Sequence, residues 1–280
     1  LSVLRKNLLN HKNTLIAYRN ELPSTFDTEV LKTVYGYTFE LKKVEKASDV
    51  SEFDGSVIFV SHQDEIFPIN QNSNIDFYIH LYVDFGSVLL VNGEQNKEYI
   101  SDIQHVRRRE TVAMTPNNCL AALKSLVNQP TSDTQKNNVA ENKTTVLDAI
   151  KEVSGANTTP LVASSGLSVQ YAILMGLVHN AIENHKGKAI KIVVPPNCYG
   201  GTNDQARRVA ACNDTIEIVD LPVDGDNDMV QSLGIVLDKL AKEDAIPYII
   251  AEIPTNPRVE VPDLQKLRDV LSAKRKTASG

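Results

Sequence analysis

The sequence has no tryptophan and only three cysteines, Cys119, Cys198 and Cys212, among its 280 residues. An odd number of cysteines without close paired spacing excludes a disulfide framework or a cysteine-rich metal site as the organising feature, and it favours a reducing compartment. No apolar run is long enough to span a bilayer, and the first residues do not have the pattern of a signal peptide. We therefore expect a cytoplasmic protein without a membrane partner and without a bound metal.

An excess of positive charge is also missing, because the formal net charge is −6. Proteins that bind nucleic acids usually present a basic face, and this composition provides none. The longest basic cluster, Arg107-Arg108-Arg109, is followed at once by Glu110 and is typical of a solvated turn or helix end. We expect no nucleic-acid partner.

A polar segment divides the chain. Residues 128–143 contain one proline and no hydrophobic period, which predicts a linker or mobile surface loop. Residues 1–127 are predicted to be an α+β region with a bend or hairpin at Gly86. Its helices are predicted at 1–18 and 118–127, and its strands at 34–41, 56–61 and 77–92. No motif in it indicates a function.

Residues 144–280 alternate between helical and strand-like patterns. A helix is predicted from Thr144, with Val146, Ile150 and Val153 on one face and Gly155 at its end. Further helices are predicted at 167–184, 203–212, 228–243 and 263–276, and strands at 160–164, 188–195, 215–223 and 246–253. This alternation predicts an α/β fold, with a mostly parallel sheet and helices on both faces. Ligands of such sheets bind beyond the carboxyl ends of the strands.

Three of these strand ends carry unusual sequences. Ser164-Ser165-Gly166 opens a helix, where free N–H groups suit a phosphate, although an ordinary serine N-cap is the alternative. In PPNCYGGT (195–202) the glycines allow close backbone approach, and Tyr199 can either stack on a flat cofactor or cover the sheet end. In AEIPTNPRVEVPDL (251–264) two prolines brace Asn256, four residues after Glu252. Because all three segments follow strand ends, we expect Gly166, Tyr199 and Asn256 to line one concavity.

Taken together, SSG at 164–166, CYGGT at 198–202 and EIPTNP with VPDL at 252–264 resemble the Cys/Met-metabolism family of pyridoxal-phosphate enzymes. This is the cystathionine gamma-synthase and lyase group of fold type I, and the resemblance covers residues 144–270. It implies pyridoxal 5′-phosphate as the cofactor, with its phosphate on the backbone N–H groups of Gly166 and Leu167, next to Ser165. It also implies that Tyr199 stacks on the pyridine ring and that Asn256 lies beside the ring hydroxyl, supported by Glu252.

The same resemblance implies a trans-sulfuration-type transferase or carbon–sulfur lyase, which acts on a small amino-acid substrate as a homo-oligomer. In the family, an aspartate and the Schiff-base lysine follow the VPDL helix, so we expect no catalytic residue within 1–280 and an incomplete, inactive chain. The family's Tyr-x-Arg pair also has no counterpart in RRRETVAMTPNN (107–118). Another fold type I enzyme, such as an aminotransferase, and a non-catalytic homologue remain alternatives.

Overall fold

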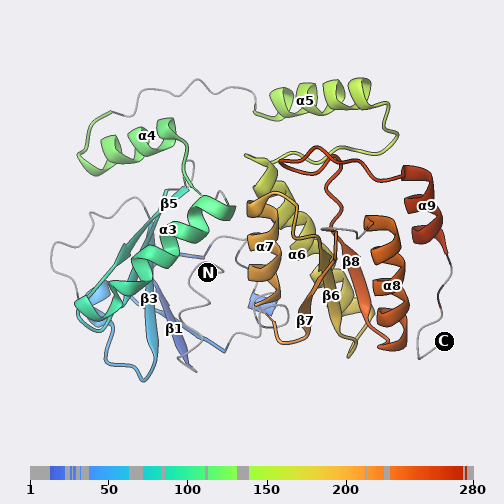
Figure 1. Ribbon diagram of the computed structural model, residues 1–280. Coiled ribbons are helices and arrows are strands. Elements are labelled where there is room, and N and C mark those ends of the chain that lie inside the picture. Colours follow the sequence, from blue (N-terminus) through green and yellow to red (C-terminus); the bar gives the residue numbers. More distant parts are fainter. Residues whose placement is uncertain are drawn as a thin grey trace. The chain divides into compact units, whose positions relative to one another are not determined.

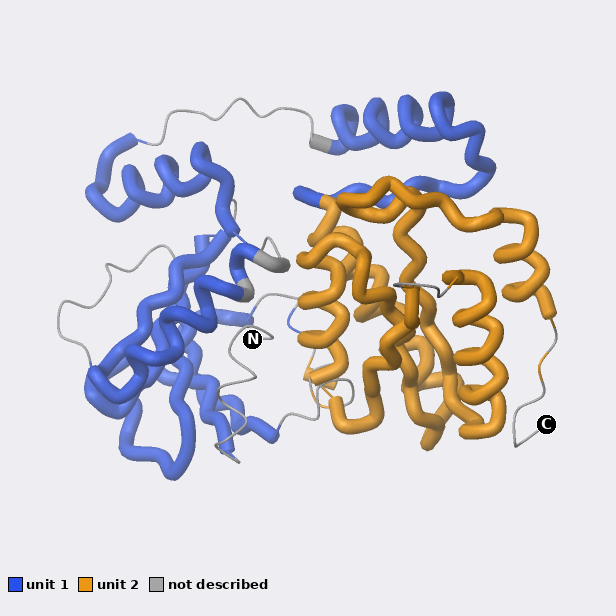
Figure 2. Tube along the Cα trace, viewed as in Figure 1, with its two compact units in different colours: residues 1–27, 38–165 blue, residues 28–37, 166–280 orange. Residues whose placement is uncertain are grey.

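The computed structural model describes residues 13–22, 26, 28–29, 32, 38–62, 72–82, 86–110, 113–130, 139–211, 213–223, 228–273 and 275. The chain forms two compact units, one of residues 1–27 and 38–165 and the other of residues 28–37 and 166–280 (Figure 2). Among the described helices, none is both long and apolar enough to cross a membrane.

The first unit contains a five-stranded sheet with the order β2-β1-β3-β4-β5 (Figure 1). The first four strands pair in parallel, and the last pairs antiparallel with its neighbour. The strands are β1 (Thr14–Tyr18), β2 (Glu40–Lys43), β3 (Ser56–His62), β4 (Phe77–Tyr82) and β5 (Gly86–Val91). Because the sheet is mostly parallel, this region is α/β, and the α+β prediction was wrong.

Strand β1 also corrects the predicted helix at 1–18. Leu15, Ile16 and Ala17 are all buried, so both faces of this strand are covered. A parallel strand buried on both faces gives a continuous apolar run, which periodicity cannot distinguish from a buried helix. Residues 1–12 and 33–37 lie outside the described residues, so the rest of that helix and the start of the strand at 34–41 are not tested.

Other predictions for the first unit are confirmed. Strand β3 covers 56–61, and β4 and β5 divide the run at 77–92, with Gly86 at φ +128° where β5 begins. The helices are α3 (Glu98–Glu110), α4 (Pro116–Leu126) and α5 (Val139–Ser154), with 3-10 turns η1 (Ala47–Asp49) and η2 (Glu94–Asn96). The arginine cluster lies at the end of α3.

The predicted linker at 128–143 is corrected in part. Helix α5 begins at 139, so the last part of the predicted linker is helical, and residues 131–138 lie outside the described residues.

The second unit contains a three-stranded parallel sheet with the order β7-β6-β8. Its strands are β6 (Ile190–Val194), β7 (Ile216–Asp220) and β8 (Ile246–Ile249), and its helices are α6 (Gly166–Asn184), α7 (Gly200–Ala210), α8 (Met229–Lys242) and α9 (Leu264–Ser272). The strand predicted at 160–164 does not form, and Leu161 there is 70% exposed. A strand needs a hydrogen-bonded neighbour, and this short run has none in either sheet.

Helices cover both faces of the second sheet, as predicted. Ile190, Ile192 and Val194 of β6 lie in one buried cluster with residues of α6 and α7. Val193, on the opposite face of the same strand, lies in a cluster with residues of α8 and α9. The loops that follow the strands therefore lie at the carboxyl edge of a sheet with two covered faces.

Candidate functional site

The carboxyl ends of the second sheet are where a ligand site is expected. From β6 the chain crosses to β7 on one side and then to β8 on the other, so the order reverses between β6 and β8. Ligands of open α/β sheets bind at such a switch point, beyond the carboxyl ends of the strands. The loops after β6 and β8 carry the second and third sequence motifs.

Tyr199 and Glu252 connect these two loops. The backbone N–H of Tyr199 donates to both carboxylate oxygens of Glu252, at 3.2 and 3.0 Å. Tyr199 is the N-cap residue of α7, so this carboxylate also lies where the helix dipole favours negative charge. The interaction fixes the backbone of Tyr199 and leaves its side chain 46% exposed.

Gly201 has a structural reason to be glycine, and Gly200 does not. A Cβ atom on Gly201 would lie 2.5 Å from Cε1 of Tyr199 and 3.2 Å from Cδ1 of Leu167, whereas one on Gly200 would meet nothing within 4 Å. The ring of Tyr199 therefore lies against the backbone of Gly201, beside the side chain of Leu167. Gln205, in the middle of α7, also connects the two helices, because its Nε2 donates to the carbonyl oxygen of Leu167 at 2.9 Å.

Gly166 is the first residue of α6 and is exposed, with nothing within 4 Å of the position a Cβ would take. The first N–H groups of a helix have no acceptor within the helix, and they carry the positive end of its dipole. Ser165, which is partly buried, precedes it directly. The start of α6 therefore has both the donors and the open space that a phosphate requires.

Asn256 lies on a loop that is closed on itself. The N–H of Thr255 donates to the carbonyl oxygen of Glu260, and the N–H of Glu260 donates to Oγ1 of Thr255, both at 3.0 Å. Nδ2 of Asn197 reaches the Glu260 carboxylate at 3.2 Å, so the loops after β6 and β8 are joined a second time. Hydrogen bonds thus join Tyr199 and Glu252, and the side chains of Tyr199 and Leu167 both lie near Gly201, whereas Asn256 is exposed on its own loop.

Cys198, in the loop after β6, is a buried free cysteine. Burial raises the pKa of its thiol, and the negative charge of Glu252 raises that pKa further, against hydrogen bonds involving Asn203 that lower it. The reactive form of cysteine is the thiolate, which a raised pKa makes scarce at neutral pH. Cys198 is a buried packing residue.

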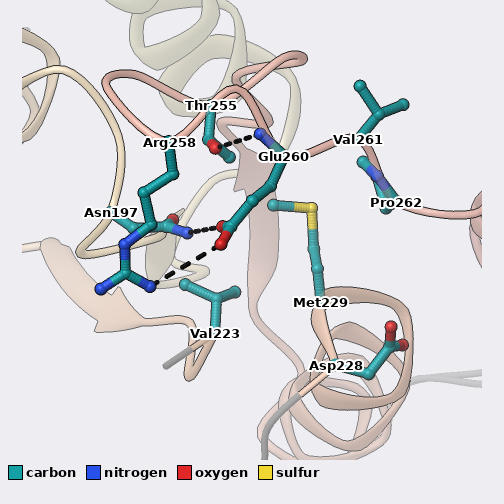
Figure 3. A pocket seen from close by; sticks show the side chains of 9 residues that line it. All are labelled: Asn197, Val223, Asp228, Met229, Thr255, Arg258, Glu260, Val261 and Pro262. Atoms are coloured by element: carbon teal, nitrogen blue, oxygen red, sulfur yellow. Dashed lines mark hydrogen bonds and ion pairs between the residues drawn. The ribbon is translucent and has the colours of Figure 1, made fainter. Parts of the chain in front are cut away.

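The cavity at this edge has other lining residues than the sequence predicted. It has a volume of about 230 Å³, and none of the six predicted cofactor residues lines it (Figure 3). The expectation that Gly166, Tyr199 and Asn256 line one concavity is not met by this cavity. Its lining residues are Asn197, Val223, Asp228, Met229, Thr255, Arg258, Glu260, Val261 and Pro262. The available sequence signal was the charged pair Arg258 and Glu260 inside the proline-braced loop.

Comparison with protein families, curated proteins and solved structures finds no match to this chain. Within the part of the chain that the structure describes, no group of three or more His, Cys, Asp or Glu residues is placed to hold a metal ion. The resemblance to pyridoxal-phosphate enzymes therefore rests on the three sequence motifs alone.

Proposed function

We propose that the carboxyl edge of the second sheet binds pyridoxal 5′-phosphate, and that the chain belongs to a fold type I enzyme of sulfur amino-acid metabolism. The observation that carries the proposal is the contact of the Tyr199 ring with the Gly201 backbone, next to Leu167 at the start of α6. Because a Cβ on Gly201 would meet both the Tyr199 ring and the Leu167 side chain, the contact supports an aromatic surface near the N-terminus of α6. A cofactor that combines an aromatic ring with a phosphate requires these two features together.

The start of α6 holds the phosphate in this proposal. The backbone N–H groups of Gly166 and Leu167 donate to the phosphate oxygens, next to Ser165, and the helix dipole offsets part of the negative charge. The absence of a Cβ on Gly166 leaves the approach open. Because backbone atoms make these contacts, the leucine at 167 is compatible with this role.

Tyr199 and the loop after β8 hold the ring. The Tyr199 side chain is exposed enough to stack on a bound pyridine ring, and Glu252 fixes its backbone through two contacts. Asn256 presents an amide toward the ring hydroxyl, from a loop stiffened by Pro254 and Pro257. When bound, pyridoxal phosphate acts as an electron sink for chemistry at the amino-acid substrate.

These residues bind and orient the cofactor, and we assign no proton transfer to them. The lysine and the aspartate that the family uses have no counterpart among the matched positions. The reaction class that the resemblance implies is elimination or replacement at the β or γ carbon. An assay of the protein at its natural length with cystathionine separates the alternatives. Carbon–sulfur cleavage supports the proposal, transamination to a keto acid indicates an aminotransferase, and no reaction indicates a non-catalytic homologue.

The binding claim is tested with pyridoxine 5′-phosphate, which has no aldehyde and therefore cannot react with surface lysines. Equilibrium dialysis compares its affinity for the 280-residue chain with that of pyridoxine, the same ring without the phosphate. We expect the phosphate to improve binding at least about tenfold, as charge-assisted hydrogen bonds do. Equal affinities would rule out a phosphate site at α6.

Two matched pairs of variants locate the ligand. Gly166→Pro removes one N–H group at a helix position that tolerates proline, whereas Gly166→Ala keeps it. Tyr199→Ala removes the ring, whereas Tyr199→Phe keeps it. We expect the first member of each pair to weaken binding about tenfold and the second to change it little. Equal affinities within both pairs would place the ligand elsewhere.

A further inference from the structure

Two polar side chains of α7 connect this helix to the start of α6. Thr202 and Gln205 lie three positions apart, and residues at this spacing share one face of a helix. Oγ1 of Thr202 donates to Oε1 of Gln170 at 3.2 Å. Nε2 of Gln205 donates to the carbonyl oxygen of Leu167 at 2.9 Å. Two hydrogen bonds from one face of α7 therefore reach the first two turns of α6.

The burial of Gln205 costs free energy. Its side chain is 0% exposed, and its Oε1 has no hydrogen-bond partner among the described residues. A buried amide loses its contacts with water, and only one side of this amide gains a partner in return. The neighbouring Ala206 and Val209 of α7 belong to a buried apolar cluster. Stability alone therefore favours an apolar side chain at position 205.

The amide of Gln205 instead holds Leu167. Its hydrogen bond fixes the backbone carbonyl of Leu167. The Leu167 side chain lies against the same helix, because a Cβ on Gly201 would be 3.2 Å from Cδ1 of Leu167. Helix α7 thus contacts Leu167 at both its backbone and its side chain. The N–H group of Leu167 is one of the two donors that the proposed function assigns to the phosphate.

Such a contact matters most at the end of a helix. Helix ends fray, and the first N–H groups have no acceptor within the helix. A donor that is already oriented binds an anion more tightly than one that must be ordered on binding. Because Tyr199 is the N-cap residue of α7, a contact between α6 and α7 also fixes the phosphate donors relative to the aromatic ring.

We propose that Gln205 is a positioning residue for phosphate binding, which acts by holding the backbone of Leu167 at the start of α6. This inference rests on the proposed cofactor site and adds a residue to it. Because Gln205 is fully buried, it does not touch the ligand itself. Its removal should therefore weaken phosphate binding without weakening the fold.

The test compares Gln205→Met with the unaltered 280-residue chain. Methionine has a similar size and adapts to an apolar site, but it cannot donate to Leu167. Equilibrium dialysis measures the affinities for pyridoxine 5′-phosphate and for pyridoxine. We expect the first affinity to fall about fivefold and the second to change less than about twofold, because only the phosphate depends on the oriented donors. The midpoint of urea denaturation should stay the same or rise.

A control variant and a second measurement complete the test. Gln231→Met makes the same substitution at an exposed residue of α8 and should change neither affinity. In ligand-free protein, ¹⁵N relaxation should show lower order parameters for the Gly166 and Leu167 amides of Gln205→Met than for those of the unaltered chain. This measurement does not depend on any ligand.

The outcomes separate this inference from the cofactor proposal. If the unaltered chain prefers pyridoxine 5′-phosphate over pyridoxine, and Gln205→Met keeps that preference or the original order parameters, the cofactor site stands and the role of Gln205 is wrong. A lower urea midpoint, or failure of Gln205→Met to fold, would also overturn the inference, because Gln205 would then serve the fold. No preference in the unaltered chain would overturn both proposals.

Discussion

Two polar regions of the molecule differ in how completely their buried polar atoms are hydrogen-bonded. In the first unit, the Asn92 side chain donates to the carbonyl oxygens of Ile75 and Asn72, at 2.6 and 3.0 Å. The Asn72 side chain in turn donates to the carbonyl oxygens of Ala47 and Val50, at 2.9 and 2.8 Å. The two asparagine side chains thus donate to backbone carbonyl oxygens of several loop residues, and this asparagine network holds those loops in place.

The carboxyl edge of the second sheet is less completely paired. Oδ1 of Asn197, Nε2 of Gln170 and Oε1 of Gln205 are buried without hydrogen-bond partners among the described residues. All three residues adjoin the starts of α6 and α7 or the loop after β6. A buried polar atom without a hydrogen-bond partner costs free energy, so this edge should contribute less stability than the asparagine network does.

The largest effect that would sharpen this comparison is on stability. Asn92→Ala removes two hydrogen bonds and leaves the carbonyl oxygen of buried Ile75 without this donor, which should cost about 3 kcal/mol in free energy of unfolding. Asn197→Ala removes one exposed hydrogen bond, to Glu260, and should cost less than about 1 kcal/mol. Urea denaturation, with native-state hydrogen exchange to separate the two units, measures both. Equal costs would remove the distinction between the two regions.

The next effect is on ligand affinity. Gly201→Ala places a Cβ against the Tyr199 ring and forces it to move, whereas Gly200→Ala adds a methyl group in open space. We expect the first change to weaken binding of pyridoxine 5′-phosphate about tenfold and the second to leave it unchanged, because the displaced ring loses its stacking geometry. If equilibrium dialysis finds no difference between these two variants, the Tyr199 ring is not part of the site.

The smallest effect is on pH dependence in the first unit. His80 is buried in β4, and its Nδ1 lies 3.0 Å from Oγ of Ser61. Burial lowers the pKa of His80, and the neighbouring His62 lowers it further. The unfolded chain, where histidine has a pKa of about 6.5, then binds this proton more readily than the folded chain. Stability contributed by neutral His80 is complete above that value and is lost as pH falls toward the folded pKa.

The free energy of unfolding of the first unit should change with pH by at most about 1.4 kcal/mol per pH unit, the value for one proton. Hydrogen exchange of the β3 and β4 amides between pH 7 and pH 5 measures it. His80→Gln should reduce the slope, and His185→Gln, a change at an exposed residue of the second unit, should not. A slope that is the same in both variants would show that His80 does not take up the proton.

The sequence predicted the second unit well because its apolar runs alternate regularly with helical patterns, and α6, β6 and α8 lie where expected. It failed where burial or strand pairing determines the structure. The short apolar run of β1 is buried on both faces, and the run at 160–164 has no strand partner. Sequence reasoning also placed the motifs with Tyr199 and Glu252 at one edge of the sheet, where these two residues are hydrogen-bonded. It did not predict the residues that line the cavity, since Asn197, Val223 and Asp228 are separated in sequence and only the folded loops bring them together.

The central claim is that the starts of α6 and α7 bind a phosphate-bearing aromatic ring. The most direct test is an amide NMR titration of the ¹⁵N-labelled 280-residue chain with pyridoxine 5′-phosphate, with inorganic phosphate as the comparison. We predict that the amides of Gly166 and Leu167 shift with both ligands, and that those of Tyr199 and Gly201 shift only with the ring-bearing one. The amides of Asn72 and Asn92 should not move. Shifts that leave residues 166–167 and 199–201 unaffected, or that concentrate in the first unit, would contradict the claim.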